Sequence, residues 1–109
     1  MSIATQVYAL TRSFPKDELY GMTSQLRRSS VSIAANIAEG YGREVRGSFV
    51  QFLRIAQGSL KETETHLLIA ERVGIVKRKQ IAGLLEQSDE LGRMLHSLIR
   101  SLQRKSASE

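Results

Sequence analysis

The chain has 109 residues, of which 41% are hydrophobic and 25% charged, and this composition is typical of one soluble folded domain rather than a disordered segment. It contains no cysteine, which excludes a disulfide scaffold and a cysteine-ligated zinc site. The net charge of +5 is consistent with a polyanionic partner, nucleic acid before acidic lipid, and equally with an ordinary charged surface.

The first two segments with helical spacing lie on either side of the single proline, Pro15. One helix is predicted over about residues 3–13, ending where Pro15 disfavours helical geometry at the residue before it. A second is predicted over about residues 21–39, with glycines after it that suit a left-handed helix cap. The inner stripes of the two helices are Ile3, Val7, Leu10 and Phe14, and Met22, Leu26, Ser30, Ile33 and Ile37.

Two longer helices are predicted over about residues 47–73 and 77–105, with Gly74 as the cap between them. In both, the inward residues alternate steps of three and four without a break, which is the spacing of a heptad seam. The two seams are Phe49, Leu53, Ala56, Leu60, Thr63, Leu67 and Ala70, and Ile81, Leu84, Ser88, Leu91, Leu95, Leu98 and Leu102.

These elements predict an all-α protein, an antiparallel up-down four-helix bundle with a short first helix. Residues 1–105 are expected to form one domain and residues 106–109 a disordered tail. The short connection between the two long helices makes them antiparallel neighbours. Because the first helix is much shorter than the others, part of the core should stay open, and a neighbouring subunit is the simplest cover.

The second and third predicted helices carry more apolar surface than one bundle buries. Several small apolar residues of helix 21–39 fall opposite its inner stripe, and helix 47–73 has a second heptad stripe beside the first. A wider core face under a long loop is the alternative, but we favour a homo-oligomer. The expected oligomer seam consists of Val31, Ala35, Asn36, Ala38, Glu39, Ile55, Glu62, His66 and Ile69.

The pair Glu62 and His66 is the one weak hint of metal chemistry. Di-metal sites in bundles use Glu and His three residues apart on two helices, whereas this pair is four apart and stands alone. We expect no metal or other cofactor, and we interpret the pair as hydrogen-bonding across a packing surface, to Asn36 or Ser32. Gly58, within the third helix, is expected to permit a close helix contact.

The sequence lacks the local patterns that catalysis usually requires. No glycine-rich loop has the lysine and serine or threonine of a phosphate cradle, and no serine stands in a nucleophile elbow. We therefore predict that the protein is not an enzyme and has no catalytic residues.

Basic residues cluster on the second helix, in the loop after it and at the start of the fourth helix. Arg93, Arg100 and Arg104 share one face of the fourth helix with acidic residues, so we interpret that face as solvated surface. Few exposed aromatic residues are expected, so binding should depend on shape and charge rather than base identity. The predicted nucleic-acid-binding residues are Arg27, Arg28, Arg43, Arg46, Lys77, Arg78 and Lys79.

No part of the chain predicts membrane insertion or export. No apolar run approaches the roughly 20 residues that span a bilayer. The first residues, MSIATQVYALTRSF, lack the basic start and long apolar middle of a secretory signal. We expect a cytoplasmic protein without a membrane partner.

The stretch LRRSSVSIAANIAEG, residues 26–40, resembles the signature of the four-helix-bundle proteins encoded in intervening sequences of bacterial 23S ribosomal RNA genes, sometimes called S23 ribosomal proteins. The stretch IAQGSLKE, residues 55–62, continues the resemblance, and Phe14-Pro15 with Tyr20-Gly21-Met22 is similar to the family's approach to the second helix. The resemblance covers about residues 5–100.

This resemblance implies an up-down bundle that assembles as a ring, typically a pentamer, although family members usually have a longer first helix. It also implies kinship with the accessory protein of diversity-generating retroelements, a basic pentamer that engages nucleic acid and a reverse transcriptase. We therefore predict a non-enzymatic, ring-forming protein that binds RNA or DNA through basic patches repeated by oligomerisation. The alternative is a protein–protein adaptor or scaffold, docking for example a polymerase or a ribosome-associated factor, which a large exposed apolar patch would favour.

Overall fold

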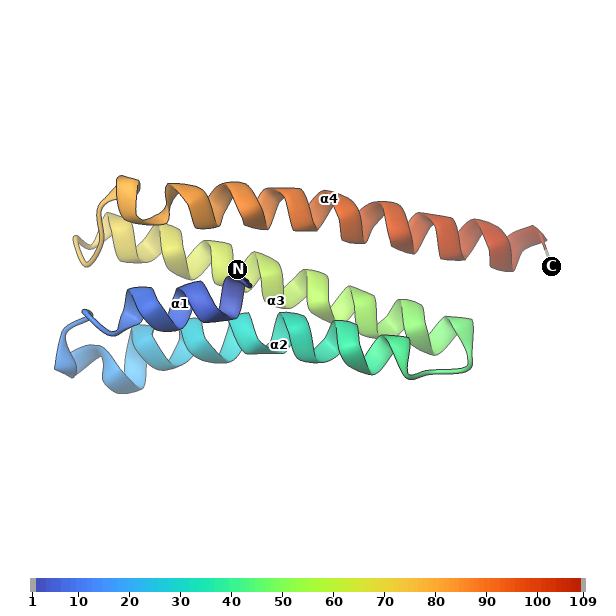
Figure 1. Cartoon of the computed structure of the whole chain (residues 1–109), viewed down its shortest axis with the longest axis horizontal. Coiled ribbons are helices and arrows are strands. Elements are labelled where there is room, and N and C mark those ends of the chain that lie inside the picture. Colours follow the sequence, from blue (N-terminus) through green and yellow to red (C-terminus); the bar gives the residue numbers. More distant parts are fainter. Residues whose placement is uncertain (1, 109) are drawn as a thin grey trace.

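The computed structural model describes residues 2–108, with side chains described for residues 2–105. Its four helices are α1 (Ile3–Thr11), α2 (Ser24–Tyr41), α3 (Arg46–Arg72) and α4 (Arg78–Ser108). They alternate in direction and lie lengthwise in a rod with Cα extents of 52 × 22 × 21 Å (Figure 1). The predicted all-α, up-down four-helix bundle with a short first helix is confirmed.

Helix α1 is held by a cap at its start and by buried apolar residues on one face. The Ser2 hydroxyl accepts a hydrogen bond from the backbone N–H of Thr5 at 3.2 Å, which satisfies one of the free donors of the first turn. Ile3 and Val7 are buried in the core, as their spacing predicted. The helix ends at Thr11, two residues before the predicted end.

The connection from α1 to α2 is more irregular than the sequence predicted. After Pro15 the chain makes a 3₁₀ turn (Lys16–Glu18) and then a π-type turn (Leu19–Thr23). Gly21, within the second turn, has φ −104° and ψ −108°, which are not helical values. Helix α2 therefore begins at Ser24 and not at residue 21, because the backbone at Gly21 interrupts the helical hydrogen-bond pattern.

Helices α2 and α3 share the most extensive contact in the bundle. The Thr63 hydroxyl donates to the Ser29 hydroxyl at 2.8 Å, and the Ser32 and Ser59 hydroxyls lie 2.8 Å apart. At the far end, a Cβ on Gly40 would lie only 3.0 Å from the Phe49 ring. Small and hydroxyl-bearing side chains thus allow the two backbones to approach closely while satisfying the polar groups they bury.

The two interhelical loops end their helices in different ways. Gly74 has a φ of +84°, and the Ile75 N–H donates to the Ala70 carbonyl at 2.9 Å, so this glycine is the predicted left-handed cap of α3. Gly42 after α2 has a φ of −81°, so the prediction of a left-handed cap there was wrong. Its N–H donates to the Glu39 carbonyl at 3.1 Å, which ends the helix without a positive φ.

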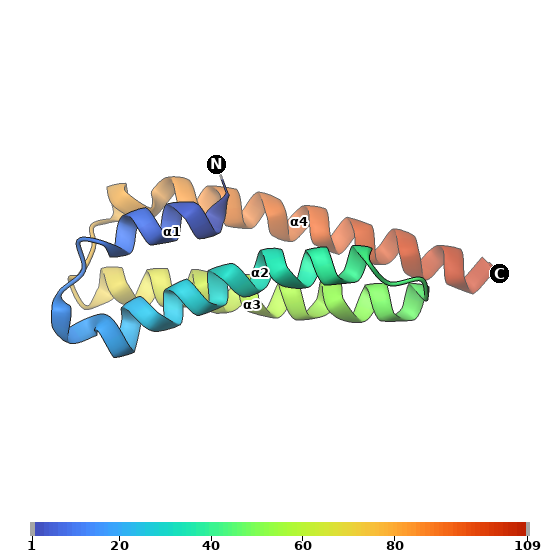
Figure 2. The ribbon, with the colours of Figure 1, turned by 60° about the horizontal axis from the view of Figure 1, so that its bottom comes forward.

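Helix α4 runs to Ser108, and its last turns extend beyond the α2–α3 loop (Figures 1 and 2). The predicted helix end near residue 105 was three residues early, because no proline or glycine stops the helix there. That residues 106–109 form a disordered tail stays a prediction. Glu109, the last residue of that predicted tail, lies outside the described residues. Within the described part of the chain, no helix is long and apolar enough to cross a bilayer.

Helix α1 lies alongside only part of the bundle, and its N-terminal end stops well short of the far ends of α2 and α4 (Figure 2). A pocket of 370 Å³ lies there between α2 and α4, with Ile33, Ile37, Leu91 and Met94 among its walls. The expected gap in the fourth wall is therefore present.

The hydroxyl of Ser88, in the fully buried part of α4, has no hydrogen-bond partner among the described residues.

Candidate nucleic-acid interface

The seven predicted nucleic-acid-binding residues fall at the two ends of the rod. Arg27 and Arg28 lie near the start of α2, and the Lys77–Lys79 run spans the start of α4. Both groups are at the end of the rod that carries the α1–α2 and α3–α4 connections (Figure 1). Arg43 and Arg46 lie at the other end, beside the α2–α3 loop. Because the rod is 52 Å long, the structure brings these residues together as two groups and not as one surface.

Arg27 and Arg43 are held by other side chains of the bundle. The Arg27 guanidinium lies 4.7 Å from the centroid of the Tyr8 ring, and its Nε donates to the Thr11 hydroxyl at 2.9 Å. The Arg43 guanidinium donates to the Glu39 carboxylate at 3.0 Å and lies 4.8 Å from the Phe52 ring centroid. Both arginines therefore help to hold helices in place, whatever else they bind.

Arg78 forms a two-pronged ion pair with Glu71 across the α3–α4 turn. Its Nε and Nη2 each donate to one carboxylate oxygen at 2.8 Å. These hydrogen bonds lower the pKa of Glu71 and raise the pKa of Arg78, because each stabilises the charged form of its partner. Part of the charge of the Lys77–Lys79 run is thus neutralised within the fold.

Arg28, Lys77 and Lys79 are the predicted residues most available to a ligand. All three are exposed, and their side chains form no hydrogen bond or ion pair with any described residue. Arg46, the remaining member of the set, is half-buried at the first residue of α3.

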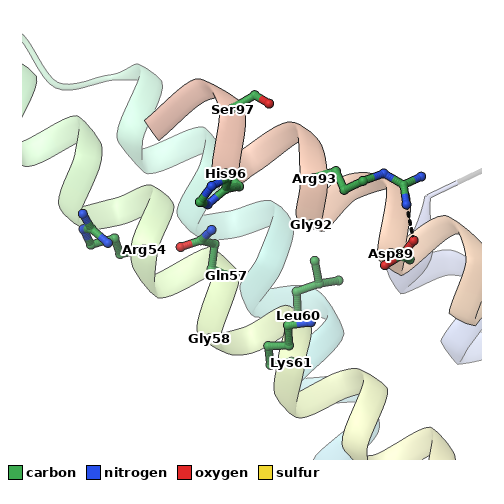
Figure 3. A pocket seen from close by; sticks show the side chains of 10 residues that line it. All are labelled: Arg54, Gln57, Gly58, Leu60, Lys61, Asp89, Gly92, Arg93, His96 and Ser97. Atoms are coloured by element: carbon green, nitrogen blue, oxygen red, sulfur yellow. Dashed lines mark hydrogen bonds and ion pairs between the residues drawn. The ribbon is translucent and has the colours of Figure 1, made fainter. Parts of the chain in front are cut away.

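A groove of about 790 Å³ lies between α3 and α4 (Figure 3). Leu60, Gly58 and Gly92 are among its lining residues, and the side chains of Gln57 on α3 and His96 on α4 project into it from the two helices. The groove is lined by Arg54, Gln57, Gly58, Leu60, Lys61, Asp89, Gly92, Arg93, His96 and Ser97.

The groove carries more positive than negative charge. Arg54, Lys61 and Arg93 contribute cations, and the one carboxylate of its lining, Asp89, accepts a hydrogen bond from Arg93. Arg54 is exposed and has no polar partner among the described residues. The Nζ of Lys61 lies 3.6 Å from an oxygen of the half-buried Glu64, and the Lys61 side chain itself is exposed to solvent.

This groove was not predicted from the sequence. Arg93 and its neighbours were interpreted as solvated surface, and Gly58 was predicted to permit a close helix contact. The Gly58 prediction was wrong, because a Cβ at that position would have nothing within 4 Å. The signal that was present is the spacing of Arg54 and Lys61, which are seven residues apart and so share one face of α3.

The predicted oligomer seam lies on the outer surface of α2 and α3. Val31, Ile55 and Ile69 are each between 43% and 45% exposed. Asn36 and His66 are half-buried, and the remaining members, Ala35, Ala38, Glu39 and Glu62, are exposed. The apolar part of the seam is therefore outside the core of the single chain.

The polar centre of the seam differs from the prediction. The Asn36 amide donates to the Ser32 carbonyl at 2.8 Å, within α2, and the Ser32 hydroxyl pairs with Ser59. The His66 Nε2 lies 4.0 Å from a Glu62 oxygen and has no hydrogen-bond partner, so the expected bond from this pair to Asn36 or Ser32 is absent. Nowhere in the described residues do three or more His, Asp or Glu side chains come together as metal ligands would.

Comparisons with known proteins agree with this architecture. A solved structure from Bacteroides thetaiotaomicron VPI-5482, a protein with unknown function from the S23 ribosomal protein family, is similar with a TM-score of 0.76 and 30% sequence identity. The match covers 89% of this chain and 87% of that chain. No curated protein matches the chain.

The family comparison matches most of the chain, with the description 23S rRNA-intervening sequence protein and residues 1–97. Neither this match nor the solved structure concerns retroelement accessory proteins, so that kinship stays an expectation. Neither names an enzyme, and the prediction that the protein lacks enzymatic activity also stays a prediction. Because the match spans residues 1–97 of 109, the chain belongs to the 23S rRNA-intervening sequence protein family.

Proposed function

We propose that this protein is a non-enzymatic, ring-forming bundle that binds RNA or DNA, with the α3–α4 groove as its main contact to the phosphate backbone. The groove is the observation that carries the proposal, because it concentrates cationic side chains from two helices in one concave surface. Arg54 and Lys61 are two helical turns apart, about 10 Å along α3. Rows of charge at such spacings follow a phosphate backbone and release its counterions.

Two glycines in the lining of the groove favour close approach of a nucleic-acid backbone. Gly58 and Gly92 have no side chains, so a strand can lie near the helix axes. Gln57, His96 and Ser97 add hydrogen-bonding side chains beside the cations, which suits phosphate and sugar oxygens. No Phe, Tyr or Trp is among the lining residues of the groove, so the proposed contact is mainly to the backbone and independent of base sequence.

The exposed apolar residues of α2 and α3 support the ring. Val31, Ile55 and Ile69 expose large side chains that a neighbouring subunit can cover. Assembly would repeat the groove around an axis and multiply its phosphate contacts. We propose a homo-oligomer in the cytoplasm, a pentamer by family resemblance. The same apolar face favours the second candidate, an adaptor that docks another protein there.

Substitution of Gly58 tests the groove directly. Because a side chain at this position enters open space, Gly58→Glu should fold normally while placing a carboxylate among the cations. We expect its affinity for a structured RNA to fall by at least about tenfold in filter binding at low salt. Gly58→Gln adds a side chain of similar volume without the charge, and its affinity for the same RNA should stay within about threefold of the wild-type value.

A remote charge control completes the experiment. Thr5→Glu makes the same change in net charge at an exposed residue in the first turn of α1, away from the groove and from the predicted basic residues, and should leave affinity nearly unchanged. Equal losses in Gly58→Glu and Thr5→Glu, or wild-type binding that does not weaken with added salt, would contradict the proposal. Light scattering tests the ring separately, since a mass near the 12.2 kDa of one chain would refute it.

A further inference from the structure

A second pocket, of about 500 Å³, lies where α1, the π-type turn and the start of α2 meet. Two tyrosines, Tyr8 and Tyr20, and two arginines, Arg27 and Arg28, are among its lining residues. No Asp or Glu is among the described residues that line it, so the arginines are its only charges. The pocket therefore combines aromatic surface with uncompensated positive charge.

Arg27 is positioned in this pocket before any ligand arrives. Its guanidinium is stacked 4.7 Å from the Tyr8 ring centroid, and its Nε is held by Thr11 at 2.9 Å. Thr11 is itself buried and donates to the Val7 carbonyl at 2.8 Å, which fixes the acceptor. The two terminal nitrogens of Arg27 form no hydrogen bond with any described residue, so they are available to an anion.

Tyr20 is exposed to an extent that packing does not explain. It is 92% exposed, the largest value among the described exposed large hydrophobic residues. The π-type turn places it there, because the non-helical backbone at Gly21 separates Leu19 and Tyr20 from the regular surface of α2. An aromatic ring in water contributes nothing to the core, so its place beside two arginines points to a ligand with a flat face.

From these observations we propose that the pocket binds an unpaired nucleotide of RNA or DNA. The base stacks on the Tyr20 ring, with the Tyr8–Arg27 stack as a second flat surface, and the phosphates pair with Arg27 and Arg28. An apolar peptide fits the same space less well, because it would bury the arginines without a partner. This inference rests on the proposed function and deepens it. The groove binds the phosphate backbone of single-stranded and double-stranded nucleic acid alike, whereas this pocket binds only an unpaired nucleotide of a single strand.

The exposed tyrosines of this pocket differ from what was expected from the sequence. Few exposed aromatic residues were expected, and binding was expected to depend on shape and charge alone. Tyr8 and Tyr20 are both exposed, and both lie beside a predicted phosphate-binding arginine. Stacking on such rings tolerates every base, so the pocket distinguishes unpaired from paired nucleotides without reading sequence.

The experiment compares a labelled single-stranded RNA of about 12 nucleotides with the duplex of the same sequence. We expect Tyr20→Ala to weaken single-strand binding by about tenfold and to leave duplex binding within about twofold. Tyr20→Phe, which keeps the ring, should restore single-strand affinity. Leu68→Ala, which shortens an exposed apolar side chain on α3 outside the pocket, should have little effect on either RNA.

Each remaining outcome overturns the inference in a distinguishable way. If wild type binds neither RNA, the proposed function fails and this inference fails with it. If wild type binds RNA but Tyr20→Ala binds the single strand equally well, the inference fails and the groove survives. If Tyr20→Ala and Leu19→Ala both lower the mass measured by light scattering, the pocket is a contact between copies of the chain and not a nucleotide site.

Discussion

The α2–α3 side of the bundle and the α1–α4 side are packed in different ways. Along α2 and α3, glycine and hydroxyl-bearing residues hold the backbones close, and the buried hydroxyls of Ser29 and Thr63 bond to each other. On the other side, α1 stops short, a 370 Å³ pocket remains and the Ser88 hydroxyl is left without a partner. The α2–α3 interface is therefore the more tightly packed of the two, whereas the α1–α4 side contains space that its side chains do not fill.

The largest expected effect comes from filling the close α2–α3 contact. In Gly40→Leu the new side chain meets the Phe49 ring at 3.0 Å and the Phe52 Cβ at 3.3 Å, and the latter atom is fixed to the backbone. We expect a loss of about 2–3 kcal/mol in the free energy of unfolding, measured by urea denaturation. Gly83→Leu on α4, where a Cβ meets nothing within 4 Å, should lose none. Similar losses in both variants would mean that the α2–α3 side is not the tighter one.

A smaller effect, of opposite sign on the two sides, is expected from removing one hydroxyl. Ser88→Ala removes a buried group that has no hydrogen-bond partner and should raise the free energy of unfolding by about 1 kcal/mol. Ser29→Ala removes one of the two acceptors of the Thr63 hydroxyl, the other being the Ser59 carbonyl, and should lower the free energy of unfolding by about 1 kcal/mol. Thermal and urea denaturation of the matched pair measure the difference, and equal signs would contradict the comparison.

The smallest expected effect depends on pH and concerns the turn that joins the two sides. Hydrogen bonding to Arg78 lowers the pKa of Glu71 in the folded chain. The pair therefore stabilises the fold fully above the ordinary Glu pKa, and this contribution is lost as the pH falls through the lowered folded value. We expect the small Tm difference between wild type and Glu71→Gln to be present at neutral pH and to vanish in acid. A difference that persists at low pH would show that Glu71 acts through packing instead.

Much of the fold was predictable because apolar spacing repeats over many turns. Most of the two long seams was predicted, and Leu53, Leu60 and Leu67 are all buried as expected. Toward the end of α4, Ile99 is buried although it was not predicted, and the predicted Leu98 and Leu102 are only half-buried. The other errors lie where spacing carries no information. The backbone at Gly21 and the cap at Gly42 depend on one residue's dihedral angles, and the end of α4 has no stop signal.

The candidate site was predicted less well, because it depends on which helices become neighbours. The predicted arginines were correctly placed on exposed elements, but Arg27, Arg43 and Arg78 have partners within the fold. Those partners come from residues 16, 4 and 7 positions away in the chain, and only the four-residue pair follows from helical spacing. The single-chain sequence pattern therefore overstated the free charge of these clusters.

The sequence by itself determined that four helices form and which stripe of each turns inward. The reason is that apolar residues recurring about every 3.6 positions lie on one face of a helix, and that face is the one that must be buried. It also predicted the apolar stripe that stays outside the single chain. Only the tertiary structure decided that Arg54 and Lys61 of α3 share a groove with Arg93 and His96 of α4. The physical reason is that antiparallel packing sets which turns of two helices meet, and local periodicity does not carry that register.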